Sequence, residues 1–195
     1  MRAAKAVIGL CCACNAPGNH TAASDPGSGS KGLRKGSVVT SSSGAPVRQH
    51  GLSEGQRVPD VELTLQDGRH VGLKDFRGKK VVLFFYPMDD TPGCRAEAQG
   101  FRDYHQQFLN ENSLVLGVSL QGAESHQAFI AKERLPFDLV VDNEAHVSRA
   151  FGVPIHGQAT ARQTYLIGEN GMVEEVWRQV SPREHAQAVL SAIRH

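Results

Sequence analysis

The sequence predicts an α/β domain in which a mixed central sheet carries helices on both faces. A continuous apolar run at 81–86, Val-Val-Leu-Phe-Phe-Tyr, is typical of a strand that is buried on both sides. Further along the chain, strand-length apolar runs alternate with helical patterns, which is the order expected of an α/β sheet. An Asn-Gly pair at 170–171 separates two more apolar segments and predicts a hairpin near the end of the chain.

The individual elements can be assigned in order. Alternating residues at 61–65 and 69–73 flank Asp67-Gly68 and predict a first hairpin. After the central strand we expect helix 95–109, strand 114–119, helix 122–134, strand 137–141, helix 143–151 with Gly152 as its C-terminal cap, and a hairpin that joins 164–168 to 172–178. Ser181 and Pro182 supply an N-cap and a first helical residue for the closing helix.

Length and charge divide the chain near residue 50. A chain of 195 residues suffices for one domain with a full core, and we assign that domain to residues 51–195. Residues 1–50 hold six Lys or Arg residues and one acidic residue, whereas the domain holds fifteen Lys or Arg residues and nineteen acidic residues. A mildly acidic domain lacks the basic patch of nucleic-acid-binding proteins. No apolar run is long enough to span a bilayer.

The segment from Pro87 to Cys94 links the buried strand to the first helix. Pro87 ends the strand, Thr91 can act as N-cap and Pro92 fills the first helical position, so Cys94 falls in the first turn. Unpaired N–H groups and the positive end of the helix dipole favour an anion there, and the thiolate is the reactive form of cysteine. The placement predicts a reactive thiol; the simpler interpretation is a small buried residue at a helix start.

Pro-x-x-x-Thr-x-x-Cys after an apolar strand resembles the active-site signature of the peroxiredoxins. Thr-Pro-Gly-Cys followed by Glu97-Ala98 and by Phe-Arg-Asp at 101–103 resembles their PrxQ, or bacterioferritin-comigratory, branch. Similar segments continue in the family's order over residues 51–195, at 117–119, 124–126, 135–137, 151–153 and 162–167. The resemblance implies a thioredoxin-like fold and a thiol-dependent peroxidase that reduces hydrogen peroxide and organic hydroperoxides through a cysteine sulfenic acid. It implies no metal, haem or flavin, and we expect a monomer or weak homodimer.

The resemblance also assigns roles around the thiol. Cys94 would be the nucleophile, and Thr91 would offer its hydroxyl to the thiolate and the peroxide. The backbone N–H groups of Gly93 and Cys94 would add donors, while Pro87 would shield the thiolate from water.

Arg162 corresponds to the family's active-site arginine. Its guanidinium, always charged, would stabilise both the thiolate and the departing oxygen. Glu97 is expected to orient Arg162; the alternative is an ordinary solvated carboxylate. His126 matches the family's Ser-His and is interpreted as structural, whereas Gln121 stands where the family commonly has Asp and receives no role.

One departure bears on the mechanism. Many PrxQ members have a resolving cysteine five residues after the first, where this chain has Gln99. We therefore expect a one-cysteine mechanism, in which thioredoxin or a small thiol attacks the sulfenic acid, or else resolution by the remaining cysteines of the chain, Cys11, Cys12 and Cys14.

Residues 1–50 permit three interpretations. A plain disordered extension leaves the protein in the cytoplasm, which is our expectation; the alternatives are a secretory signal cleaved near Ser24 and an organelle transit peptide. Cys-Cys-x-Cys at 11–14 also suggests metal binding, although the second ligand pair of a zinc site is missing. For the domain, the alternative function is a non-catalytic redox sensor or binding module of thioredoxin fold.

Overall fold

A computed structural model describes residues 51–195. The expectations for residues 1–50, including Cys11, Cys12 and Cys14, lie outside the described residues. In chain order the elements are β1 (Glu62–Thr64), β2 (His70–Gly72), the 3-10 helix η1 (Leu73–Phe76), β3 (Lys80–Phe85), α1 (Pro92–Asp103), α2 (His105–Asn110), β4 (Ser113–Ser119), α3 (Ala123–Glu133), β5 (Leu139–Val141), α4 (His146–Phe151), β6 (Ile155–His156), β7 (Ala159–Thr160), β8 (Gln163–Ile167), β9 (Val173–Trp177) and α5 (His185–Ile193).

The central sheet has five strands in the order β5-β4-β3-β8-β9. Strand β3 runs parallel to β4 and antiparallel to β8, so the sheet is mixed as predicted. Along β3 the side chains alternate between two apolar clusters: Val81, Leu83 and Phe85 enter one, whereas Val82 and Phe84 enter the other. This alternation explains the continuous apolar run, because both faces of the strand are covered.

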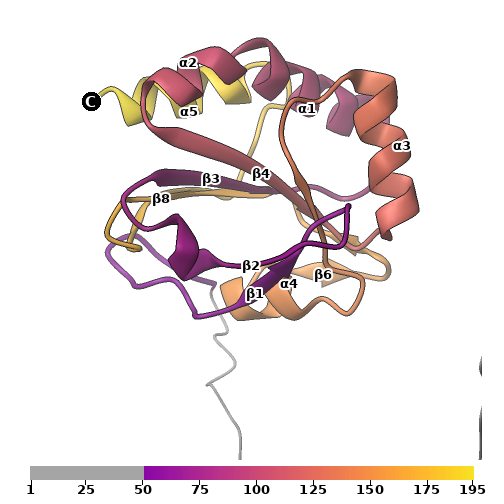
Figure 1. The fold of residues 1–195 in the computed structure, drawn as a ribbon, viewed down its shortest axis with the longest axis horizontal. Helices are drawn as coiled ribbons and strands as arrows, with labels where there is room; N and C mark the ends of the chain where they lie inside the picture. Colours follow the sequence, from indigo (N-terminus) through magenta and orange to yellow (C-terminus); the bar gives the residue numbers. More distant parts are fainter. Residues whose placement is uncertain (1–50) are drawn as a thin grey trace, which may run out of the picture. The chain divides into compact units, whose positions relative to one another are not determined.

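The two faces of the sheet are covered differently (Figure 1). Helices α1, α2, α3 and α5 bury side chains in the cluster that contains Phe84 and Cys94. The β1–β2 hairpin and α4 contribute to the opposite cluster, around Phe85 and Tyr165. The prediction of helices on both faces is therefore confirmed, and the thiol lies on the face with more helices.

Three details differ from the sequence-based expectations. The helix predicted over 95–109 is two helices, because Tyr104 leaves the helical conformation between α1 and α2. The closing helix begins at His185 rather than near Ser181, and residues 181–184 form a turn. The short β6–β7 hairpin gave no periodic signal, since each strand has only two residues.

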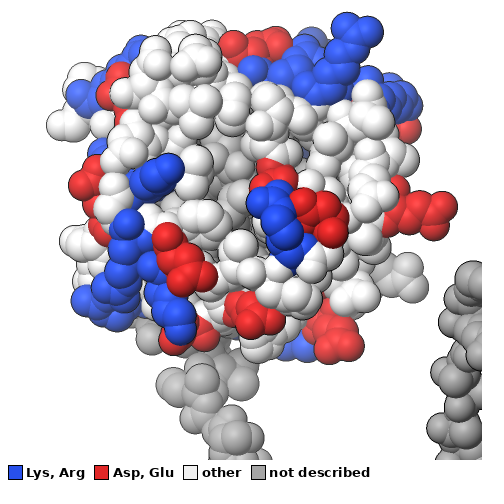
Figure 2. All heavy atoms as spheres, in the orientation of Figure 1, with Lys and Arg blue, Asp and Glu red and all other residues white. Residues whose placement is uncertain are grey.

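The described residues contain no helix that is long and apolar enough to cross a membrane. On the face that Figure 2 shows, positive and negative side chains are interspersed. Among the ion pairs of the described residues, the ammonium group of Lys132 lies 2.6 Å from a carboxylate oxygen of Asp90.

Candidate active site

Cys94 lies in the first turn of α1, directly after the loop that leaves β3. Thr91 occupies the N-cap position with an extended backbone, but its hydroxyl donates to the Met88 carbonyl at 3.2 Å and caps no helical N–H group. The first backbone hydrogen bond of the helix joins the Arg95 N–H group to the Thr91 carbonyl at 2.8 Å. The N–H groups of Gly93 and Cys94 precede this bond and have no intrahelical acceptor.

The register of the sheet brings Arg162 to the thiol. Phe85 at the end of β3 pairs with Gln163 at the start of β8, so the preceding Arg162 lies level with the beginning of the β3–α1 loop. Arg162 Nη2 donates to Cys94 Sγ at 3.2 Å. The other terminal nitrogen of Arg162 donates to Glu97, one helical turn after Cys94.

Burial shapes the electrostatics of this triad. Cys94 is 1% exposed and Glu97 is fully buried, while the Arg162 side chain is 18% exposed. Burial raises the pKa of Glu97 to about 7, although the charge and hydrogen bond of Arg162 oppose the shift. Burial disfavours the charged form of Arg162, but Glu97 and Cys94 outweigh it and raise the pKa of the guanidinium.

Glu97 therefore contacts Arg162, and the alternative of a solvated carboxylate is wrong because the side chain is buried. Only one oxygen of the Glu97 carboxylate, Oε2, accepts a hydrogen bond from Arg162. The other oxygen, Oε1, is buried and has no hydrogen-bond partner among the described residues. A fully buried carboxylate beside one guanidinium holds that guanidinium in place.

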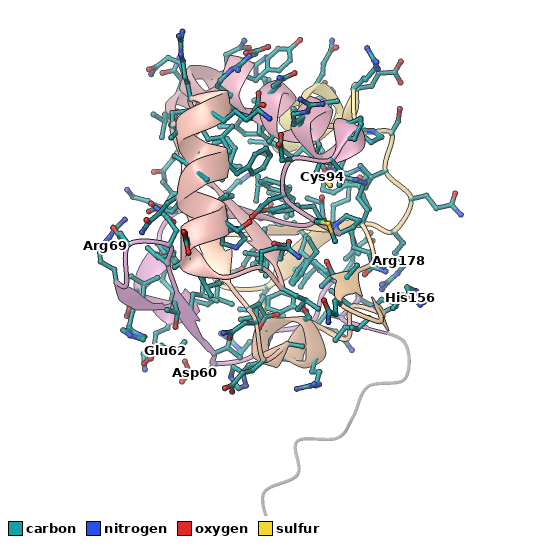
Figure 3. All side chains as sticks on the ribbon, turned by 90° about the vertical axis from the view of Figure 1, so that its right-hand side faces the viewer. Asp60, Glu62, Arg69, Cys94, His156 and Arg178 are labelled. Atoms are coloured by element: carbon teal, nitrogen blue, oxygen red, sulfur yellow. The ribbon has the colours of Figure 1, made fainter. Side chains whose placement is uncertain are left out.

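Gly93 allows the guanidinium to come close. A Cβ atom at this position would lie 3.3 Å from Arg162 Nη2 and 3.9 Å from Cγ of Pro182. The turn before α5 therefore lies beside the start of α1, which accounts for the late start of the closing helix. Pro87 is half-buried at the start of the loop. Figure 3 shows Cys94 toward the side of the molecule where His156 and Arg178 lie, away from Arg69.

Sequence reasoning missed the polar side chains that surround the loop. Asp89 is buried and accepts hydrogen bonds from Tyr86, Ser125 and His126. Gln121, to which the sequence assigned no role, accepts a hydrogen bond from the Asp89 N–H group through Oε1, at 3.3 Å. The adjacent acidic pair at 89–90 was the one available signal, since a carboxylate beside a buried strand needs a partner.

Two further polar residues were missed. The hydroxyl of Thr160 donates to the Tyr86 carbonyl at 2.9 Å and so fixes the end of β3. His185 is buried, with Nε2 2.7 Å from Thr164 Oγ1, and burial together with the charge of Arg162 lowers its pKa to about 4. Neither residue stands in a pattern that the sequence alone distinguishes from ordinary surface residues.

Within residues 51–195 no group of three or more His, Cys, Asp or Glu side chains is arranged to hold a metal ion. The chemistry that the described site offers is that of a buried thiol with a fixed cation and free backbone donors beside it. Such an arrangement stabilises negative charge that develops nearby.

Comparison with known proteins identifies the family. The model of the AhpC/TSA family matches residues 55–176. The chain is 38% identical over 156 residues to peroxiredoxin Q, chloroplastic, of Sedum lineare, which covers 76% of this chain and 84% of that protein. It is 38% identical over 147 residues to peroxiredoxin Bcp of Bacillus subtilis (strain 168), and the match covers 72% of this chain and 94% of that protein.

Solved structures give the same result. A PrxQ mutant from Xylella fastidiosa superposes with a TM-score of 0.70 at 33% identity, covering 73% of this chain and 96% of that one. The bacterioferritin comigratory protein of Xanthomonas campestris gives a TM-score of 0.68 at 32% identity, and the match covers 73% of this chain and 98% of that one. The predicted thioredoxin-like fold is confirmed, and the chain belongs to the AhpC/TSA family as a peroxiredoxin of the PrxQ/Bcp type, a thiol peroxidase.

Proposed function

We propose that Cys94 is the nucleophile of this thiol peroxidase and that Arg162 is its electrostatic partner. The observation that carries the proposal is the 3.2 Å hydrogen bond from Arg162 Nη2 to Cys94 Sγ. The Cys94 thiolate attacks one peroxide oxygen, an S–O bond forms as the O–O bond breaks, and the leaving oxygen departs with the electron pair of that bond. Arg162 stabilises the thiolate first and the leaving oxygen afterwards; the leaving group then takes a proton from water.

The neighbouring residues divide the remaining work. The N–H groups of Gly93 and Cys94 hold the peroxide oxygens, and Thr91 accepts the peroxide O–H group while its own hydroxyl donates to Met88. Pro87 limits access of water to the thiolate. Glu97 acts through Arg162, because its hydrogen bond fixes the direction of the guanidinium.

We infer a one-cysteine mechanism for regeneration. Cys94 is the one free cysteine in the described part of the chain, and Gln99 at the alternative position donates to Glu133 at 2.7 Å. An external thiol therefore attacks the Cys94 sulfenic acid, which releases water and forms a mixed disulfide; a second thiol then reduces that disulfide. Thioredoxin and small thiols are both candidates. Resolution by Cys11, Cys12 or Cys14 is the competing route.

The proposed substrates are hydrogen peroxide and organic hydroperoxides. The Xanthomonas campestris relative is described as having alkyl peroxide reduction activity, which supports the second class. We assign the catalysis to residues 51–195 as a monomer or weak homodimer. We propose a cytoplasmic location; N-terminal sequencing of the protein from its own cells tests this, because loss of residues 1–50 would instead support export or an organelle, as in the relative named chloroplastic.

Intact-protein mass spectrometry tests the mechanism. The reduced full-length chain is treated with one equivalent of hydrogen peroxide, and Cys94→Ser serves as the control. Gain of one oxygen that requires Cys94 supports the one-cysteine route. Loss of two hydrogens that requires Cys94 means a disulfide with Cys11, Cys12 or Cys14. Full peroxide turnover by Cys94→Ser would overturn the assignment of the nucleophile.

A further inference from the structure

A buried Asp–His pair lies at the base of the loop that carries the proposed active-site residues. His126 Nδ1 lies 2.8 Å from Asp89 Oδ2, and the two side chains are 0% and 5% exposed. Asp89 belongs to the β3–α1 loop, whereas His126 belongs to α3. The hydroxyls of Tyr86 and Ser125 also donate to the Asp89 carboxylate, at 2.7 and 2.6 Å.

Hydrogen-bond partners surround both side chains of this pair. His126 Nε2 lies 3.1 Å from the Val140 carbonyl, which can only accept, so this nitrogen carries a hydrogen. Burial opposes ionisation of Asp89, yet hydrogen bonds and charge from His126, with hydrogen bonds from Ser125 and Tyr86, lower its pKa below the ordinary value. The Asp89 carboxylate is thus surrounded by the His126 ring and the hydroxyls of Ser125 and Tyr86, and the second nitrogen of the His126 ring is held by the Val140 carbonyl.

The pair fixes the loop from several directions. The Asp89 N–H group donates to Gln121 after β4, while His126 connects the Asp89 carboxylate to α3 and, through Val140, to β5. The next residue, Asp90, has a φ of +59°, a left-handed conformation that needs support from its surroundings. Pro87 and Thr91 lie two residues on either side of Asp89, so the position of Asp89 sets the position of both.

We propose that Asp89 and His126 form a buried, hydrogen-bonded anchor that positions the β3–α1 loop for the attack of Cys94 on peroxide. The inference rests on the proposed role of Cys94. Asp89 and His126 are positioning residues: the hydrogen bonds of this cluster reach the loop, α3 and β5, and their effect on the reaction passes through the loop. The in-line displacement depends on alignment of the peroxide, so a small shift of the loop slows this reaction more than a reaction without such alignment.

The chain offers a matched control on the same loop and helix. Lys132 of α3 binds Asp90 with its ammonium group 2.6 Å from the carboxylate, but the two side chains are 52% and 46% exposed. An exposed pair contributes little, whereas loss of one partner of a buried pair leaves an uncompensated charge. Lys132→Ala therefore removes a charged tether between the same two elements without disturbing the buried anchor.

The test compares two reactions of Cys94 in the full-length chain, with peptide mass spectrometry to localise each product. One is oxidation by hydrogen peroxide and the other is alkylation by iodoacetamide, which needs the thiolate but no peroxide alignment. In His126→Gln we expect the ratio of oxidation to alkylation rates to fall by about 10- to 100-fold. In Lys132→Ala the ratio stays within about twofold of wild type.

Ser125→Ala is the second variant, because loss of the buried His126 ring beside Asp89 can prevent folding. It deletes one hydroxyl donor to Asp89, and we expect the ratio to fall by about fivefold. If His126→Gln folds, an unchanged ratio of oxidation to alkylation rates in this variant overturns the proposal. If His126→Gln does not fold, an unchanged ratio in Ser125→Ala overturns it. An equal fall in Lys132→Ala, or equal slowing of both reactions, also overturns it. Failure of wild-type Cys94 to react with peroxide would instead refute the proposed function.

Discussion

Arg162 joins Cys94 to Glu97, with one terminal nitrogen of the guanidinium on each partner. The Sγ atom lies 3.2 Å from Nη2, and both Cys94 and Glu97 are almost completely buried. One cation thus serves two acidic groups in an environment that screens charge poorly. The fixed direction of the guanidinium, rather than its charge alone, is the feature that a variant can test.

Replacement of Arg162 by Lys keeps the charge and removes the planar pair of donors. A lysine ammonium cannot reproduce the two directed bonds to Sγ and Glu97, so Cys94 oxidation should slow by about 100-fold. Stopped-flow measurement of the second-order rate constant with hydrogen peroxide tests this. Arg95→Ala is the matched control: Arg95 follows Cys94 in sequence, but its Nε lies 3.7 Å from Asp90.

We expect Arg95→Ala to retain the wild-type rate within about threefold, because exposed ion pairs contribute little. Equal losses in Arg162→Lys and Arg95→Ala would show that general positive charge, and not the geometry of Arg162, drives the reaction.

Gly93→Ala should disturb the same guanidinium from the other side. The new Cβ atom would lie 3.3 Å from Arg162 Nη2, so Arg162 has to move, and we expect oxidation of Cys94 to slow by about tenfold. Gly122→Ala, at the N-cap of α3, adds the same methyl group in open space. A rate in Gly93→Ala that equals the Gly122→Ala rate would mean that the close approach is not needed.

The fold and the place of Cys94 in the first turn of a helix were predictable from local patterns. The apolar run at 81–86, the Pro at the first helical position and the two hairpin turns each act over a few residues, and the structure confirms the corresponding elements. Arg162 required the resemblance, because its approach to Cys94 depends on the pairing of Phe85 with Gln163.

The anchor around Asp89 was beyond sequence reasoning for the same reason. Asp89 and His126 are separated by 37 residues, and their contact arises only when α3 packs beside the β3–α1 loop. The late start of α5 also reflects tertiary packing, since Pro182 lies beside Gly93 instead of opening the helix.

Gln99→Cys tests the one-cysteine interpretation by restoring a second thiol. Residues 94 and 99 lie on the same helix, α1, too far apart for the geometry of a disulfide. A disulfide between the two residues requires this part of α1 to unwind. Oxidation should link Cys94 to the introduced thiol with loss of two hydrogens, and it should also reduce the helical circular dichroism signal. Gln107→Cys on α2 is the control, and its thiol should not pair with Cys94. Retention of the full helical signal in the oxidised Gln99→Cys protein would contradict this prediction.

The pH dependence of stability should carry opposite contributions from Glu97 and His185. Burial raises the pKa of Glu97 from 4.5 to about 7, so its contribution to the unfolding free energy is complete below pH 4.5 and is lost as the pH rises toward 7. Burial and Arg162 lower the pKa of His185 from 6.5 to about 4, so its contribution is complete above pH 6.5 and is lost as the pH falls toward 4.

The two effects oppose each other between pH 4.5 and 6.5, and each reaches at most about 1.4 kcal/mol per pH unit. Glu97→Gln removes the first, so its unfolding free energy should rise with pH more steeply than that of wild type. His185→Gln removes the second, so its slope should change in the opposite direction. Urea unfolding at several pH values measures both slopes. Parallel curves for wild type and Glu97→Gln would mean that Glu97 has the same proton affinity in the folded and unfolded chain, and its burial beside Arg162 would then be electrostatically neutral.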